Sequence, residues 1–570
     1  MLIRPAQGEK YGSFDERTAE ECILRGLNQM AAMAQSVTVL QQQNGYLKPA
    51  SLPNQASSPI SCYGSFGSDQ DGLLLSMSPL SPQVNGFAKQ NGYRKSSYVS
   101  KAEWKSVESS EHSQATINPI RRIVDVMAVE PNPNKSLIKL HLGDPTMTGG
   151  LPSHPNIVQA FVDSVMSGRY NGYGPAVGLH EVRQCLAKKV TCPEAPVTAD
   201  DFILTSGCSH ALQIAIEAVA NPGDNILIPR PGFPLYSTLM KPHGIQEKFY
   251  NLLVDAGWQI DLEQLESLID SKTKAILINN PSNPCGAVFS KEHLQRVLEI
   301  ADRHKVPIIA DEIYGDLTWG GAKFIPIATL EPKVPVITCD GIGKRYLVPG
   351  WRLGWIVIHD RNHVLKHVRE GMRHLAQKIV GPCGPVQGAL PAVLEKTPQS
   401  FFENTKHVLA ANAKVAFSVL QGTPGIRPVK PKGAMYMMIG IDTARFPHFR
   451  GNSMEFVKAL ISEESVYCLP GSAFFYPDSF RIVLTYPEDV TQEACERVRG
   501  FCLRHYSFSP ELARLKIGSP EATFVLDGSE GEEEDSSPDY SPPLSPPIPV
   551  ADGSVMGGVL RRKFTATMLV

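Results

Sequence analysis

Lys344 is the residue whose place in the chain most favours covalent chemistry. It follows an apolar run at 334–339 that is typical of a buried strand, and the stretch 341–354 is too rich in Gly and Pro to be predicted as helix. A lysine at a strand end can be shielded from water, lose its proton and attack a carbonyl carbon. An isolated lysine is usually a solvated surface residue. Arg352 and several other polar segments favour the reactive interpretation here.

Three further segments place polar side chains directly after predicted strands. Segment 205–212 joins a strand to an amphipathic helix, so its amides and the Ser209 hydroxyl could bind a phosphate. The Asn283 amide and the Tyr314 hydroxyl could bond a phenolic oxygen, and Asp311 could keep a heterocyclic nitrogen protonated. Singly, each has an ordinary alternative, namely a Gly/Ser turn, an Asx turn or an acidic helix start. Together they favour one binding site.

The elements that must position these residues have the pattern of an α/β layer structure. Helical patterns such as 291–303 separate continuous runs of apolar, mostly β-branched residues, which predicts strands covered on both faces. The predicted strands are 202–205, 225–229, 275–279, 306–310, 334–339 and 354–358. A second α/β unit begins near residue 386 and contains the strand-like words 433–440 and 479–485. Catalytic residues are expected at strand ends.

Both ends of the chain differ from this centre. Residues 1–105 mix Gln, Ser, Asn, Gly and Pro, which predicts a disordered leader with one short helix near 16–35. Residues 508–570 contain an acidic run and Ser-Pro repeats, which predicts a second disordered tail. The Ser-Pro steps are candidate phosphorylation sites. A globular core at 106–507 is therefore expected between two tails.

Composition excludes several classes of protein. The chain has 570 residues, 42% of them hydrophobic and 20% charged, with a net charge of −2, as in a soluble enzyme with no field for nucleic acid. It contains no apolar run of about eighteen residues, so no membrane span is expected. The 11 cysteines form no CxxC pair and the 15 histidines no HExxH, so neither disulfides nor a metal site are predicted. The start of the chain lacks the pattern of a secretory signal or a mitochondrial presequence, which favours the cytoplasm.

The motifs, taken in order, resemble those of the class I/II aminotransferases that depend on pyridoxal phosphate. The resemblance runs from about 115 to 507 and implies a fold-type I transferase, with a large mixed-sheet α/β domain and a smaller α/β domain. It places the large domain at about 165–385 and the small domain at 106–164 plus 386–507. The matching words are Asn-Pro-Ile-Arg-Arg-Ile-Val-Asp at 118–125, Tyr-Asn-Gly-Tyr-Gly at 170–174, Asn-Pro-Ser-Asn-Pro-Cys-Gly at 280–286, Asp-Glu-Ile-Tyr-Gly at 311–315 and Leu-Val-Pro-Gly-Trp-Arg-Leu-Gly-Trp at 347–355.

The resemblance also implies a role for each site residue. Lys344 matches the lysine that forms the Schiff base with pyridoxal 5'-phosphate, and Arg481 the arginine that pairs with the substrate carboxylate. The residues that match the rest of the cofactor site are Cys208, Ser209 and Arg352 at the phosphate, Phe233 on the ring, Asn283 and Tyr314 at the phenolic oxygen, and Asp311 at the pyridine nitrogen. Tyr173 matches a tyrosine that reaches the phosphate of a neighbouring subunit, which implies a homodimer. Gly143 and Asn283 would lie near the substrate carboxylate.

Within that family the words match the branch that transfers the amino group of L-tyrosine to 2-oxoglutarate, giving 4-hydroxyphenylpyruvate and glutamate. Transfer from another aromatic amino acid, from kynurenine or from alanine stays open, as does a lyase reaction on the same fold. An inactive scaffold that displays SH3-binding tails would require eroded cofactor residues. None of these residues is eroded.

Overall fold

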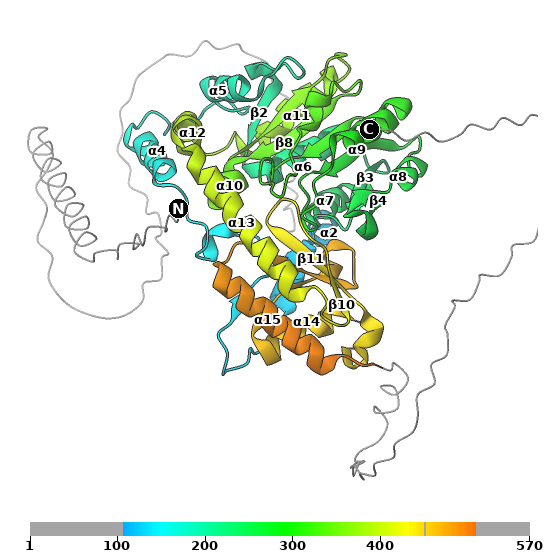
Figure 1. Cartoon of the computed structure of the whole chain (residues 1–570). Coiled ribbons are helices and arrows are strands. Elements are labelled where there is room, and N and C mark those ends of the chain that lie inside the picture. Colours follow the sequence, from blue (N-terminus) through cyan, green and yellow to red (C-terminus); the bar gives the residue numbers. More distant parts are fainter. Residues whose placement is uncertain (1–105, 450–451, 509–570) are drawn as a thin grey trace, which may run out of the picture. The chain divides into compact units, whose positions relative to one another are not determined.

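The computed structural model describes residues 106–449 and 452–508 of the chain (Figure 1). The predicted leader 1–105, its short helix and all but the first residue of the tail 508–570 lie outside these residues. The described helices are α2 Glu111–Ala115, α3 Pro119–Val126, α4 Pro155–Met166, α5 His180–Val190, α6 Gly207–Val219, α7 Leu235–Met240, α8 Leu262–Ser267, α9 Lys291–His304, α10 Ile342–Arg345, α11 Lys366–Ala376, α12 Gly384–Lys396, α13 Gln399–Leu420, α14 Ser453–Glu464 and α15 Glu488–His505. No helix in the described part is both long and apolar enough to cross a membrane.

A mixed sheet of eight strands forms the larger lobe. Its order is β2-β9-β8-β7-β6-β3-β4-β5. Strands β8, β7, β6, β3 and β4 are parallel to one another, whereas the pairs β2–β9, β9–β8 and β4–β5 are antiparallel. The strands are β2 Phe202–Thr205, β3 Asn225–Arg230, β4 Gln246–Leu253, β5 Gln259–Ile260, β6 Thr273–Asn279, β7 Ile308–Asp311, β8 Val336–Gly341 and β9 Gly354–His359. All six strands predicted for this region are present, with ends shifted by at most two residues. The last two strands of this order, β4 and β5, were not predicted.

Alternate residues of the central strands enter two different cores. In β7, Ile309 packs in a cluster with residues of α6 and α11, whereas Ile308 and Ala310 pack with residues of α9 on the other face. This alternation follows from the two-residue period of a strand. Helix α9 is itself typical: Ser290 accepts a hydrogen bond from the His293 amide at its start, and its apolar residues recur at helical spacing. The predicted α/β layer architecture, with helices on both faces of the sheet, is therefore confirmed.

Two smaller sheets form the second lobe. A four-stranded antiparallel sheet has the order β10-β11-β14-β13, and β1 pairs in parallel with β12. The strands are β1 Ile138–Lys139, β10 Ile426–Pro428, β11 Tyr436–Ile441, β12 Val466–Tyr467, β13 Leu469–Pro470 and β14 Ser479–Val483. Helices α12 and α13 run from the larger lobe toward α14 and α15 in Figure 1, and α13 packs against α15. The division of the core at 164 and 385 stays a prediction, although the large sheet falls within it.

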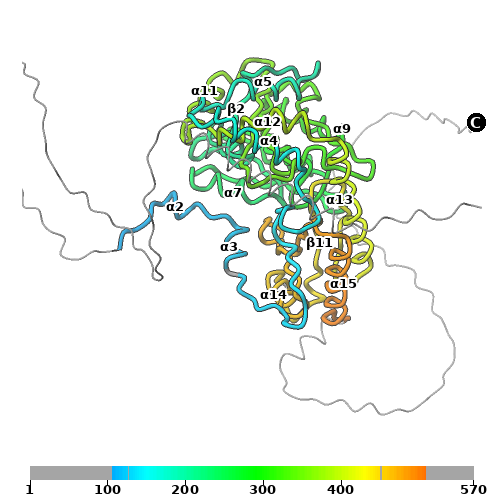
Figure 2. Tube along the Cα trace, turned by 90° about the vertical axis from the view of Figure 1, so that its left-hand side faces the viewer, coloured from blue at the N-terminus to red at the C-terminus, as the bar shows by residue number. Residues whose placement is uncertain are grey.

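A segment near the start of the core crosses the second lobe before it reaches the larger one. Figure 2 follows the chain from α3 past α14 and α15 and back toward α4. We call residues 132–143 the strap. The strap carries β1, whose Ile138 pairs with Val466, and it ends at Gly143. Its path joins the second lobe to the pocket described below.

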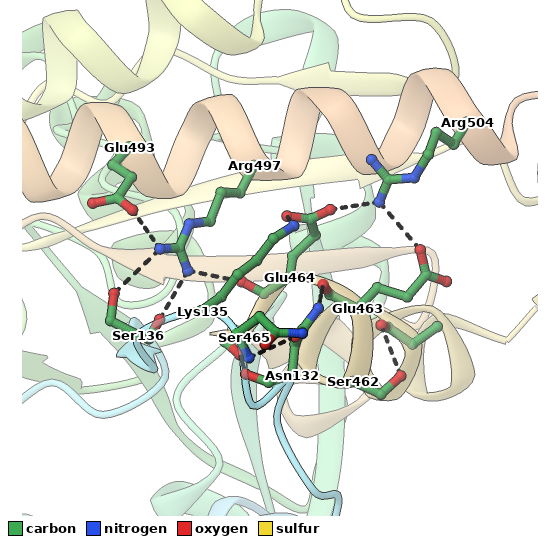
Figure 3. Close-up of polar contacts among 12 residues, drawn as sticks. Asn132, Lys135, Ser136, Ser462, Glu463, Glu464, Ser465, Glu493, Arg497 and Arg504 are labelled. Atoms are coloured by element: carbon green, nitrogen blue, oxygen red, sulfur yellow. Dashed lines mark hydrogen bonds and ion pairs between the residues drawn. The ribbon is translucent and has the colours of Figure 1, made fainter.

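Polar contacts fix the first part of the strap to the second lobe (Figure 3). Glu464, at the end of α14, lies 2.6 Å from Lys135 Nζ and 2.5 Å from Arg504 Nη2. Arg497 donates to the carbonyls of Ser136 and Glu464 at 2.8 and 2.9 Å. Burial alone would raise the pKa of Glu464, but the hydrogen bonds from Lys135 and Arg504 outweigh it and lower that pKa. The charged form of Glu464 therefore stabilises the docked strap.

Replacing Glu464 by Gln should lower the free energy of unfolding at pH 7 by about 1–2 kcal/mol, because a buried acceptor of two charged hydrogen bonds becomes neutral. Since the pKa of Glu464 is lowered from 4.5 in the folded chain, its contribution is present above pH 4.5 and is lost as the pH falls further. Urea unfolding at pH 7 and pH 4 measures both. Glu455→Gln on the same helix, which breaks an exposed pair with Lys458, is the control. An equal loss in both variants would contradict the assignment.

Candidate active site

One pocket of about 250 Å³ contains ten of the eleven residues singled out in the sequence. They come from the strap, from the end of β7, from the segments that follow β2, β3, β6, β7 and β8, and from β14. The ten are Gly143, Cys208, Ser209, Phe233, Asn283, Asp311, Tyr314, Lys344, Arg352 and Arg481. Tyr173 is not among them: its side chain is 96% exposed. The structure thus brings the set together, while the role of each residue stays a prediction.

Lys344 lies on a single helical turn, not in the irregular segment that was expected. Strand β8 ends at Gly341, and α10 begins at the next residue. The prediction was wrong because it counted the glycines at 341 and 343 as helix breakers, whereas a turn of only four residues tolerates one glycine. The Lys344 Nζ donates to the Gly143 carbonyl at 2.5 Å and lies 5.9 Å from the centre of the Tyr314 ring.

Asp311 ends β7 and is only 2% exposed. Its Oδ2 accepts a hydrogen bond from the Tyr236 hydroxyl at 2.7 Å, and its Oδ1 accepts from the Ile313 amide at 3.3 Å and lies 3.7 Å from Cys208 Sγ. Burial raises the pKa of Asp311 to about 6 even though these donors favour the charged form. A carboxylate so placed has a strong preference for a cationic partner in the pocket.

The turn that carries Asn283 is fixed by its neighbour strand. Asn279, the last residue of β6, pairs in register with Asp311, and its side chain donates to the Asp311 carbonyl at 3.1 Å. The Asn279 Oδ1 accepts from the Asn283 amide at 2.7 Å. This link orients the Asn283 side chain, whose Oδ1 accepts from Arg481 Nη1 at 2.8 Å.

Arg481 is a buried cation without an anionic partner in the described residues. It is 2% exposed and lies 4.1 Å from the centre of the Tyr436 ring and 4.7 Å from that of Phe474. Its Nη2 donates to the His141 carbonyl at 2.7 Å, and its Nε has no hydrogen-bond partner. Burial lowers the pKa of Arg481 from its usual value. Because an unpaired buried charge is costly, the site favours an anionic ligand such as a carboxylate.

The opposite side of the pocket is suited to a second anion. Cys208 and Ser209 lie in the first turn of α6, where free amides and the helix dipole attract negative charge. The Arg352 guanidinium packs on Gly207: a Cβ added there would lie 2.6 Å from Nη2, and Gly207 has a φ of +75°. Arg352 donates only to carbonyls, those of Pro349 and Ser206, at 2.9 and 3.3 Å. No described carboxylate pairs with it.

Three pocket or support residues were missed by sequence reasoning. Tyr436, on β11, bonds the Tyr314 hydroxyl at 2.7 Å, and a Cβ on Gly143 would lie 2.0 Å from its oxygen. Tyr236 supports Asp311, and Asn279 supports Asn283. Tyr436 lies within the quoted word 433–440, but its partner is 122 residues away, so spacing held no signal for the pair.

These side chains fit pyridoxal 5'-phosphate. The first turn of α6 with Arg352 would hold the phosphate, the buried Asp311 carboxylate would meet the ring nitrogen, and Asn283 and Tyr314 would bond the phenolic oxygen. Lys344 supplies the amine for the aldehyde. The carboxylate without a cation and the two arginines without carboxylates are the observations that favour this cofactor.

Replacing Tyr236 by Phe should raise the pKa of Asp311 above its value of about 6, because a donor to the charged form is lost. A hydrogen bond to a charged group predicts a rise of roughly one unit. Carbon-13 NMR of labelled Asp side chains, with Asp311→Asn for assignment, measures it. Tyr250→Phe removes an equally buried hydroxyl that bonds the Leu277 carbonyl, and it should leave Asp311 unchanged. An unchanged pKa of Asp311 in both variants would show that the Tyr236 hydroxyl does not stabilise the charged form of Asp311.

Comparison with known proteins identifies close relatives. The chain is 53% identical over 407 residues to tyrosine aminotransferase of Mus musculus, which covers 71% of this chain and 89% of that protein. It is 45% identical over 414 residues to tyrosine aminotransferase of Dictyostelium discoideum, covering 71% of this chain and 98% of that one. The model of the family "Aminotransferase class I and II" matches residues 135–498.

Solved structures give the same family. Tyrosine aminotransferase from Leishmania infantum superposes with a TM-score of 0.68 at 33% identity, covering 71% of this chain and all of that one (100%). Alanine aminotransferase from Pyrococcus furiosus gives 0.64 at 30% identity, with 70% and 100% coverage. On the matched family, the fold and the gathered site residues, the chain belongs to the class I and II aminotransferases and is a pyridoxal 5'-phosphate-dependent enzyme, as the sequence predicted.

Proposed function

We propose that this chain transfers the amino group of L-tyrosine to 2-oxoglutarate and forms 4-hydroxyphenylpyruvate and glutamate. The observation that carries the proposal is that the Lys344 amine and the Arg481 guanidinium line the same pocket. Arg481 is buried, and no described carboxylate pairs with it. Relatives from mouse, human and Dictyostelium, 45% to 53% identical, are named for this activity and support the choice of tyrosine.

The substrate carboxylate is proposed to bind Arg481. In the described structure this guanidinium donates only to neutral acceptors, Asn283 Oδ1 and the His141 carbonyl. A carboxylate is a stronger acceptor than either and matches the planar fork of the guanidinium. Stacking on Tyr436 and Phe474 holds the fork in one plane. A dicarboxylate and an aromatic amino acid can both present the required α-carboxylate.

The rest of the pocket suits an apolar ring and a proton transfer. Ile120 on α3 and Leu142 on the strap line the pocket with apolar side chains. The cofactor, when bound, supplies the electron sink for the bond broken at the substrate α-carbon. Lys344 Nζ, released to act as a base, removes the α-proton and returns it during transfer. Asp311 would place a carboxylate in the pocket away from water, since it is only 2% exposed.

The assembly is proposed to be a cytoplasmic homodimer. Helix α4 exposes an apolar stripe at helical spacing, Val158, Val162, Val165 and Met166, of which Met166 is 75% exposed. Tyr173 lies shortly after this helix and is 96% exposed, so a second copy could take it into its own site. Sedimentation of active enzyme and cell fractionation test both points. A fully active monomer, or activity confined to an organelle, would contradict them.

A panel of amino donors tests the proposed reaction. With 2-oxoglutarate as acceptor, kcat/KM should be highest for tyrosine and at least about tenfold lower for alanine, which has no ring surface for the apolar pocket to bury. Kynurenine carries a ring of its own and tests whether the pocket prefers the shape of tyrosine. Formation of glutamate measures transfer, and formation of ammonia would reveal a lyase. A preference for alanine or kynurenine would leave the family intact and refute tyrosine as the substrate.

Arg481→Lys should raise KM for tyrosine by about tenfold or more and lower kcat less, because an ammonium replaces two directed hydrogen bonds with one point charge. Equilibrium binding of the cofactor should stay at the parental level, since Arg481 lies on the substrate side. Steady-state kinetics and a cofactor titration measure these quantities. Arg427→Lys, at an exposed ion pair with Asp255, is the matched control. Parental KM in the Arg481 variant would remove the assigned role.

A further inference from the structure

The turn that carries Lys344 has little stability of its own. Helix α10 has four residues, and no side chain caps its start. Isolated helices of this length do not form in water, because too few hydrogen bonds offset the lost backbone freedom. The position of the Lys344 amine must therefore be set by contacts that α10 makes with the rest of the lobe.

Arg345, the residue after Lys344, supplies such contacts. Its Nη2 lies 2.9 Å from Asp316 Oδ2, and its Nε donates to the Gly315 carbonyl at 3.3 Å. The guanidinium also packs on Gly315, where an added Cβ would lie 3.0 Å from Nη2. Asp316, which pairs with Arg345, has a φ of +64°, so the backbone is in the left-handed region at this residue. Arg345 thus binds the segment after β7 at two neighbouring residues, Gly315 and Asp316.

The segment that Arg345 binds is the one that holds two other pocket residues. Asp311 and Tyr314 line the pocket, and the chain reaches Gly315 and Asp316 directly after them. Arg345 therefore joins the end of β7 to the turn after β8, at the level of the pocket. The two segments carry the carboxylate and the amine whose separation the reaction depends on.

The surroundings of Arg345 are rich in carboxyls. Burial alone would lower the pKa of Arg345, but the negative charges of Asp340, Asp316 and Glu312 raise it above its usual value. Glu312 is 7% exposed and accepts a hydrogen bond from the Ile327 amide at 3.0 Å, and Asp340 accepts from the Gly341 amide at 2.6 Å. Burial raises the pKa of Glu312 to about 8 and that of Asp340 to about 6. Among the described residues, Arg345 is the cation whose charge acts on both.

We propose that Arg345 is a positioning residue, which ties the Lys344 turn to the Asp311–Asp316 segment and thereby sets the distance of the Lys344 amine from Asp311 and Tyr314. The inference rests on the proposed function only in taking Lys344 as the reacting amine. Arg345 itself is not among the residues that line the pocket. Its effect on the reaction is carried by geometry.

Arg345→Gln should lower kcat by about 10- to 100-fold, because displacements near 1 Å in a reacting group cost rates of this order. KM for the amino donor should change less than about threefold, since Arg481 is untouched. The absorbance of the bound cofactor, titrated from pH 5 to 10, should change at a shifted pH, because the Lys344 amine loses its fixed surroundings. Thermal unfolding of the protein without cofactor, measured in parallel, reports stability separately.

Matched variants distinguish positioning from a general loss of stability. Arg345→Lys should recover part of kcat, because it can pair with Asp316 but cannot also direct a second donor to Gly315. Asp316→Asn should cause a smaller loss than Arg345→Gln, and the double variant should equal Arg345→Gln alone. Arg361→Gln, at an exposed pair with Glu331, should be neutral. These milder variants keep the test valid if Arg345→Gln fails to fold.

Two results would overturn the inference. One is parental kcat and parental cofactor titration in Arg345→Gln, or in both milder variants, whatever the melting temperature. The other is full additivity of the Arg345 and Asp316 changes, which would remove the ion pair as the link. The experiment uses whichever amino donor the parent chain prefers. Failure of tyrosine as a substrate would therefore appear in the parent, and failure of the positioning role only in the variants.

Discussion

The register of three parallel strands is the constraint on which the site depends. Asn279, Asp311 and Cys339 are aligned across β6, β7 and β8, so the residues that follow each strand emerge at one edge of the sheet. Backbone hydrogen bonds fix this alignment, and a shift of one residue would turn Asp311 to the other face. The Asn279 side chain then converts strand register into the orientation of the Asn283 turn. Side chains far apart in sequence thus acquire fixed separations.

The pocket contains buried charged groups that have no partner of opposite charge in the described residues. In the pocket, Arg481 and Arg352 have no described carboxylate partner, and Asp311 has no described cation, so each bears a desolvation cost that a ligand can relieve. Glu464 in the second lobe, by contrast, is paired with Lys135 and Arg504. Unmatched charge is concentrated where anions and a cationic ring would bind. The apolar cores on both faces of the sheet must compensate for the stability that these unpaired charges cost.

Sequence reasoning predicted the buried strands and the pocket residues well, and for a physical reason. Runs such as 275–279 and 306–310 lie in the middle of the sheet, where apolar character follows directly from burial on both faces. The strands β4 and β5, which end the sheet on one side, were missed because many of their residues face away from the core and carry polar side chains. The helical turn at Lys344 was missed because tertiary contacts, not propensity, hold it. Tyr236 and Tyr436 were missed because their partners are set by the fold, at 75 and 122 residues' separation.

The strap shows how the second lobe takes part in a site built mostly on the larger one. At one end it is fixed by Lys135 and Ser136, and at the other its carbonyls at His141 and Gly143 accept hydrogen bonds from Arg481 and Lys344. The two side chains that would meet the substrate, Arg481 and Lys344, are thus both bonded to neutral oxygens of one short segment. A carboxylate binds a guanidinium more strongly than a carbonyl does, so a substrate can replace the His141 contact without leaving a buried donor unpaired. Because the strap bonds both Arg481 and Lys344, its docking by Glu464 is part of the geometry of the active site.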